Sequence, residues 1–88
     1  MNITEVTVYL RSSNALKAYV NIVIDDAFVV KNIKIIEGKK GLFISMPSQK
    51  RSKGEFVDIA HPINTETRDM LKKVIMDKYY EEVEAAKG

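Results

Sequence analysis

A strict alternation of apolar and polar side chains constrains the fold of this chain more than any other feature. Val6, Val8 and Leu10 alternate with polar residues over residues 3–11, and every second residue from Leu16 to Ile24 is apolar. Successive side chains of a strand point to opposite faces, so a period of two indicates strands with one buried face. The first quarter of the chain therefore predicts two half-buried β-strands.

Three further strand-like segments follow. Residues 28–36 change phase, and either a bulge near Lys31 and Asn32 or a strand with apolar residues on both faces would explain the change. The EGKKG segment predicts a glycine-bounded hairpin turn. Because the connections are short, about five strands in one antiparallel meander are expected over about residues 2–61. The expected strands span residues 3–11, 16–24, 28–36, 42–46 and 55–60.

The period changes to that of a helix after His61-Pro62. Asn64 or Thr65 is a suitable N-cap, and Glu66 would lie in the first turn, where the helix dipole favours an anion. A helix over about residues 65–84 would bury its apolar stripe on the sheet, which gives a single two-layer α+β domain over residues 1–88. Its stripe consists of Met70, Leu71, Val74, Ile75 and Tyr79. Three glutamates near its C-terminal end oppose the dipole, so the last turn is expected to fray.

Size and composition limit the classes of protein to which this chain can belong. A core built from 88 residues is marginal on its own, so oligomerisation is expected. The chain has no cysteine, which excludes disulfides and cysteine-based metal sites or nucleophiles. No signal-peptide pattern or bilayer-length apolar run is present, so a cytoplasmic protein without membrane association is expected.

The charge is unevenly distributed. The net charge is only +2, yet residues 31–54 carry seven Lys and Arg against one Glu, a local net of +6. A concentrated positive field recruits polyanions even where the total charge is modest. A solvated, lysine-rich surface without a partner is the alternative.

A basic loop is the leading candidate site. Lys50, Arg51 and Lys53 lie in the segment MPSQKRSKGEF, between two strand-like runs. About nine residues separate Met46 from Phe56, and loops of this length inside compact domains are usually functional or disordered. Cations beside serine and glutamine are the residue types that contact phosphates, and Gly54 would let the backbone approach closely. A mobile hairpin tip is the alternative.

The predicted helix adds three cations that could extend this surface. Arg68 and Lys72 lie four residues apart on one side of the helix, and Lys73 follows. They could continue a phosphate-binding track from the loop. The alternative is ordinary decoration of a polar face, with an ion pair between Asp69 and Lys73. The aromatic residues are mostly expected in the core.

The sequence gives little support for an enzyme, and a small hydrolase that uses His61 and Asp58 is only a minor hypothesis. His61 and Asp58 are three residues apart, and such residues in a strand point to opposite faces, so an acid–base dyad is not expected. A hydrogen bond from His61 to the backbone at its corner is favoured instead. A lone histidine makes no metal cluster, and no phosphate-binding loop is present. No cofactor and no small-molecule substrate are expected.

Two long segments closely resemble the SpoVG family, which is named after stage V sporulation protein G of bacteria. They are IDDAFVVKNIKIIEGKKGLFISMPS and GEFVDIAHPINTETR, and the resemblance covers nearly the whole chain. It implies a cytoplasmic regulator of sporulation and septation that binds DNA at specific sites, and RNA in some members.

The resemblance also implies a homodimer whose β-strands join across the interface. The family's nucleic-acid surface maps onto the following residues here: Lys50, Arg51, Lys53, Arg68, Lys72 and Lys73. Lys53 adds a charge where many members have proline and an acidic residue. The expected function is therefore a non-enzymatic nucleic-acid-binding regulator. The alternative is a protein–protein adaptor in septation whose basic loop docks an acidic partner.

Overall fold

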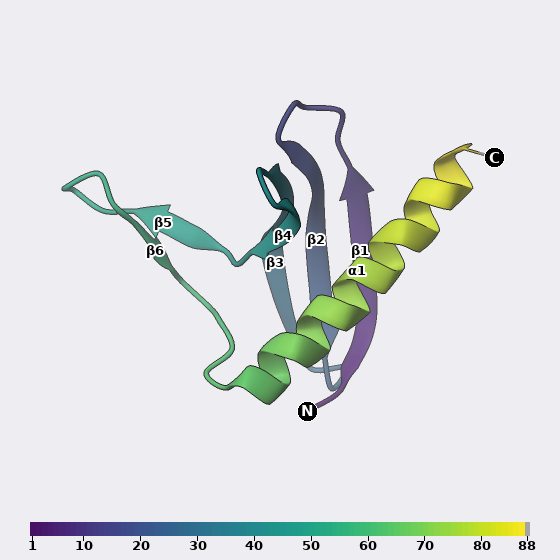
Figure 1. The fold of residues 1–88 in the computed structure, drawn as a ribbon. Helices are drawn as coiled ribbons and strands as arrows, with labels where there is room; N and C mark the ends of the chain where they lie inside the picture. Colours follow the sequence, from purple (N-terminus) through teal and green to yellow (C-terminus); the bar gives the residue numbers. More distant parts are fainter. Residues whose placement is uncertain (88) are drawn as a thin grey trace.

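The computed structural model describes residues 1–87 and confirms the two-layer α+β architecture (Figure 1). Four strands pair in the antiparallel order β1-β2-β3-β4, and one helix lies across a face of this sheet. The elements are β1 (Ile3–Leu10), β2 (Leu16–Ile24), β3 (Phe28–Gly38), β4 (Gly41–Ser45) and α1 (Thr65–Lys87). The chain thus forms a meander that ends at β4.

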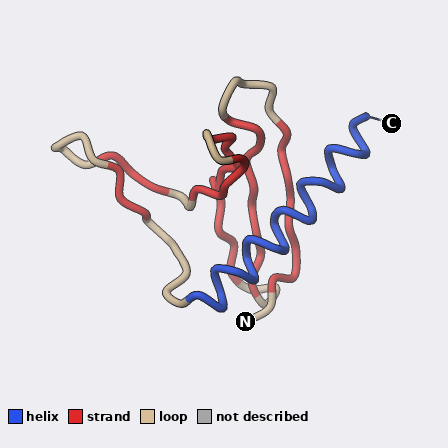
Figure 2. The backbone as a smooth tube through the Cα atoms, in the orientation of Figure 1, coloured by secondary structure: helices blue, strands red, loops and turns tan. Residues whose placement is uncertain are grey.

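The expected fifth strand does not continue this sheet. Strands β5 (Ser48–Lys50) and β6 (Phe56–Asp58) pair only with each other and form a separate two-stranded ribbon (Figure 2). Pro47 lies where the chain leaves β4, and proline has no N–H to offer a neighbouring strand. The prediction of a strand over residues 55–60 in the main sheet was therefore wrong in extent and in pairing.

The core lies between α1 and the two central strands. Its buried residues come from the inward face of β2, the inward face of β3 and the predicted helical stripe. They are Ala18, Val20, Ile22, Ile33, Ile35, Leu71, Ile75 and Tyr79. The alternating faces of β1 and β2 are confirmed, because Val6, Val8 and Leu10 also pack against this cluster.

A bulge in β3 explains its change of phase. Val20 pairs with Ile33 and Ile22 pairs with Val30, so Lys31 and Asn32 together oppose a single residue of β2. Asn32 has a φ of 65°, and its N–H donates to Asn21 Oδ1 at 3.3 Å. The extra residue lets Val30 and Ile33 share the inward face, as the predicted bulge required.

Helix α1 begins at the predicted cap. The Thr67 N–H donates to Asn64 Oδ1 at 2.8 Å, which satisfies one of the free donors of the first turn. No helix within residues 1–87 is both long and apolar enough to cross a bilayer.

The other end of α1 differs from expectation. The helix continues to Lys87 rather than ending near residue 84. The acidic side chains that oppose the dipole are paired, because Lys78 Nζ lies 3.2 Å from Glu82 and 3.5 Å from Glu81. The hydrogen bond to Glu82, together with the charge of Glu81, raises the pKa of Lys78. Lys87 pairs with Glu84 in the same way, at 3.7 Å.

Candidate nucleic-acid interface

The predicted basic loop is the tip of a projecting hairpin. We use the name basic hairpin for residues 48–58, which comprise β5, β6 and the tip between them. The Arg51 N–H donates to the Glu55 carbonyl at 2.7 Å, and the Gly54 N–H donates to the Arg51 carbonyl at 2.9 Å. The tip is therefore a closed turn of five residues, shorter than the nine-residue loop expected from the sequence.

Gly54 has a structural role that the sequence did not reveal. Its φ is +88°, a conformation that other L-residues rarely adopt, and no atom lies within 4 Å of the position that a Cβ would take. Glycine is needed here for the direction of the turn.

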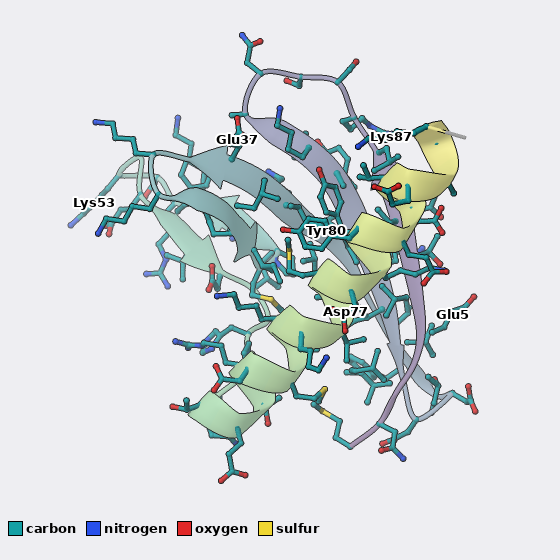
Figure 3. The ribbon with its side chains drawn as sticks, turned by 45° about the vertical axis from the view of Figure 1, so that its right-hand side comes forward. Glu5, Glu37, Lys53, Asp77, Tyr80 and Lys87 are labelled. Carbon is teal, nitrogen blue, oxygen red and sulfur yellow. The ribbon has the colours of Figure 1, made fainter. Side chains whose placement is uncertain are left out.

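The cations of the basic hairpin are freely presented. Lys50, Arg51 and Lys53 are all exposed, and none forms an ion pair with any residue that the structure describes. Figure 3 shows Lys53 at the outer end of the hairpin, far from the helix. The tip also contains one exposed carboxylate, Glu55, so the net charge over residues 50–55 is +2.

Two of the three helix cations lie near the base of the hairpin. Arg68 and Lys72 are exposed and line a hollow of about 470 Å³ between α1, the end of β4 and the segment after β6. Asp58, the last residue of β6, lines the same hollow. A carboxylate therefore shares this hollow with the two helix cations. We treat the tip cations and the helix cations as two surfaces, and the continuous track expected from the sequence stays a prediction.

Lys73 does not belong to either surface. It follows Lys72 by one residue, which turns its side chain by about 100° around the helix. Its Nζ lies 3.0 Å from Asp77, one turn further along α1. The ion pair suggested by the sequence, with Asp69, is thus replaced by one with Asp77.

His61 makes the predicted backbone contact. Its Nδ1 lies 2.9 Å from the carbonyl oxygen of Pro62, to which a protonated Nδ1 donates. His61 and Asp58 line the same hollow, but no hydrogen bond joins them within residues 1–87. The histidine is exposed and shapes the corner before α1.

Comparison with known proteins places this chain in a family. The SpoVG family model matches residues 1–81. The chain belongs to the SpoVG family. This match spans the whole sheet, the basic hairpin and the first 17 residues of α1.

SpoVG relatives align along most of their length. A protein of Lachnospira eligens is 58% identical over 80 residues, which cover 90% of this chain and 91% of the relative. One from Bdellovibrio bacteriovorus is 48% identical over 85 residues, which cover 97% and 79%. One from Clostridium perfringens is 52% identical over 80 residues, which cover 90% and 89%. Each carries the name "Putative septation protein SpoVG".

The aromatic residues of this SpoVG chain are mostly outside the core, contrary to expectation. Only Tyr79 is buried, whereas five others are exposed by at least 46%: Tyr9, Phe28, Phe43, Phe56 and Tyr80. Two of the tyrosines, Tyr9 and Tyr19, lie on the sheet face opposite α1. The alternation had already placed both on the polar side of their strands, and that signal should have outweighed residue type.

A third positive surface on that face was missed altogether. Arg11, Lys31 and Lys34 line a hollow of about 610 Å³ together with these two tyrosines. The two tyrosines and the two lysines come from three strands, and Arg11 directly follows β1, so their proximity depends on how the strands pair. Both lysines had been counted in the positive block of residues 31–54, but neither had been placed on a face of the sheet.

Proposed function

We propose that this chain is a non-enzymatic regulator that binds nucleic acid through its basic hairpin. The observation that carries the proposal is the presentation of Lys50, Arg51 and Lys53 as exposed cations without ion pairs among the described residues. A cation already paired with a carboxylate must give up that partner to bind phosphate, whereas a free one releases only water and counterions. Arg68 and Lys72 form a second phosphate contact at the hairpin base in this proposal.

The proposed contact is mainly with phosphates. Phosphate contacts fix the position of a protein on a duplex and make binding strongly dependent on salt, but they carry no sequence information. Sequence preference would come from side chains at base edges, for which Gln49 and Arg51 have suitable chemistry, or from DNA shape. Both residues are exposed on the hairpin.

The biological setting is proposed from the relatives. Their printed names describe septation proteins. We extend to this chain a role in the control of septation and sporulation, in the cytoplasm and as a homodimer. A two-fold dimer would present two basic hairpins to one duplex, which would double the number of phosphate contacts.

The experiment is a salt titration of binding to fluorescein-labelled duplex DNA and single-stranded RNA pools, followed by anisotropy. The variant Lys50→Ala/Arg51→Ala is expected to bind at least tenfold more weakly than wild type. It should also lose about 2 units of the slope of log K against log salt for each protomer in contact, because each phosphate contact contributes about 0.9.

The chain offers a matched control for charge. Lys39→Ala/Lys40→Ala removes two exposed cations from another hairpin turn, between β3 and β4, and changes the net charge equally. It should bind nearly as wild type does. Equal losses in both double variants would mean that only the overall charge matters, and the hairpin would not be the site.

One observation favours a second candidate, a septation adaptor that docks an acidic protein. Phe56 and Ile59 are 70% and 64% exposed beside the hairpin cations, and Val57 is 36% exposed. Apolar side chains next to cations suit a protein surface better than a phosphate backbone. A regulator should prefer its selected site over random DNA by roughly 10³ or more. Binding to all DNA alike, and only at low salt, would favour the adaptor.

A further inference from the structure

The sheet face opposite α1 carries a row of side chains that the basic hairpin does not explain. Tyr9 of β1 pairs directly with Tyr19 of β2, and Tyr19 pairs directly with Lys34 of β3. Directly opposed residues share a face, with Cβ atoms about 5 Å apart. Tyr9 is 46% exposed and Tyr19 is half-buried, so both aromatic rings lie at the surface of the sheet.

This face is hollowed and its lining is positive. The base of the hairpin forms one wall through Pro47, Ser48 and Ile59, and the hollow measures about 610 Å³. Its lining contains three cations and no carboxylate. By contrast, the hollow beside Arg68 contains Asp58, and a third hollow between β1 and α1 contains Glu5, Asp77 and Glu81.

One of the three cations of the hollow lies against a ring. The Arg11 guanidinium lies over Tyr19, 5.3 Å from the ring centroid, which is within cation–π range. Arg11, Lys31 and Lys34 make no ion pair with any other residue in the range 1–87. Asn21 and Asn32 add amide donors and acceptors to the same lining.

Aromatic rings beside free cations in a groove are the combination that binds unpaired nucleotides. Each exposed base can stack on an aromatic ring, and the cations neutralise the phosphates that follow the groove. A duplex cannot use the rings, because its base faces are already stacked on one another. An apolar protein surface would match this hollow poorly, because three cations line it.

We propose that the Tyr9–Tyr19 face is a stacking site for single-stranded nucleic acid, continuous with the basic hairpin through Pro47 and Ser48. This inference rests on the proposed function, because it assumes that the hairpin cations hold the phosphates of the same strand. It adds a preference for unpaired strands and assigns the two rings to two bases.

The test compares variants that keep or remove the rings. The probes are fluorescein-labelled oligouridylate and a DNA duplex of equal length. Tyr9→Leu/Tyr19→Leu is expected to bind oligouridylate at least about tenfold more weakly, since stacking on each ring contributes substantially. Its salt slope and its duplex affinity should equal those of wild type, because no cation is removed.

Two controls separate stacking from damage to the fold. Tyr9→Phe/Tyr19→Phe keeps both rings and should bind oligouridylate as wild type does. Tyr80→Leu removes another exposed tyrosine, on the helix, and should have no effect. Circular dichroism and melting temperature check that each variant folds. Equal weakening toward both probes, wild-type binding by the double leucine variant, or failure of the phenylalanine variant to bind would overturn the proposal.

A second measurement uses wild-type protein alone. Photocrosslinking to oligouridylate that contains 5-iodouridine, followed by peptide mass spectrometry, should give adducts at Tyr9 or Tyr19. Adducts confined to residues 50–56 would overturn this inference and leave the proposed function standing. Absence of binding to either probe in the titration would overturn both.

Discussion

At the scale of single residues, Tyr9 and Tyr19 show that size and aromatic character alone do not bury a side chain: Tyr9 is 46% exposed and Tyr19 is half-buried. The aromatic residues were mostly expected in the core, yet the alternation of their strands had placed these two on the polar side. Position within a periodic pattern decides burial, because the backbone alone sets which face a side chain occupies. Asn64 is the opposite case, in which residue type and position agree: it was one of the two predicted caps, the other being Thr65, and its side chain accepts the Thr67 N–H.

The cap gives a prediction at this scale. Asn64→Ala removes the acceptor of the Thr67 N–H, now at 2.8 Å, and should lower the free energy of unfolding by about 1 kcal/mol. Urea denaturation followed by circular dichroism, at one fixed protein concentration, measures the change. Asn64→Asp keeps a side-chain oxygen and should remain close to wild type. A loss as large in Asn64→Asp would mean that the capping hydrogen bond is not the cause.

At the scale of elements, long periodic segments were predicted well and short ones were not. The first two strands, the bulge at Lys31–Asn32 and the start of the helix all follow from local pattern or local chemistry. Strands β5 and β6 have three residues each, too few to show a period, and their mutual pairing depends on contacts across the tip. The sequence could not predict that Asp58 shares a hollow with Arg68 and Lys72 either, because this depends on how the chain turns before α1.

The C-terminal half of α1 gives a prediction about pH. Burial, together with the nearby Tyr80 and Glu37, raises the pKa of Tyr79 above its ordinary value of 10.0. A raised pKa means that the neutral phenol is favoured in the folded chain. Its contribution to stability is therefore complete below pH 10 and is lost as the pH rises through the folded pKa.

The raised pKa of Lys78 acts in the same direction, because its ammonium form is favoured beside Glu82 and Glu81. The contribution of these two groups to stability should thus be complete and nearly independent of pH around neutrality, and stability should fall above about pH 10. Denaturation curves from neutral to alkaline pH measure this. Tyr79→Phe should show a shallower fall than wild type, since only Lys78 then contributes. An unchanged fall would assign the effect to other groups.

At the scale of the whole molecule, the small core and the open sheet edges favour self-association. The buried cluster contains only eight residues, and both β1 and β4 are edge strands with unpaired backbone groups. We expect a homodimer joined through an edge strand, so light scattering should give about twice the chain mass of 10.0 kDa. Edge pairing would compensate for a core that is small for an independent domain.

Hydrogen exchange identifies the edge that is used. Amides of β1 or of β4 should become protected as protein concentration rises through the dissociation constant, while amides of the central strands stay protected throughout. A monomer at all concentrations would contradict the dimer. A dimer in which neither edge gains protection would place the interface elsewhere, for example on the exposed apolar residues of the hairpin.

The separation of the basic hairpin from the core has a consequence for sequence change. None of the eight core residues lies between positions 48 and 58, so we expect substitutions at the tip to change the proposed recognition without a direct effect on folding. Stability and binding preference can therefore change independently in this fold. The turn from Arg51 to Glu55 is a natural place to graft a different loop, provided that its residue with positive φ stays glycine.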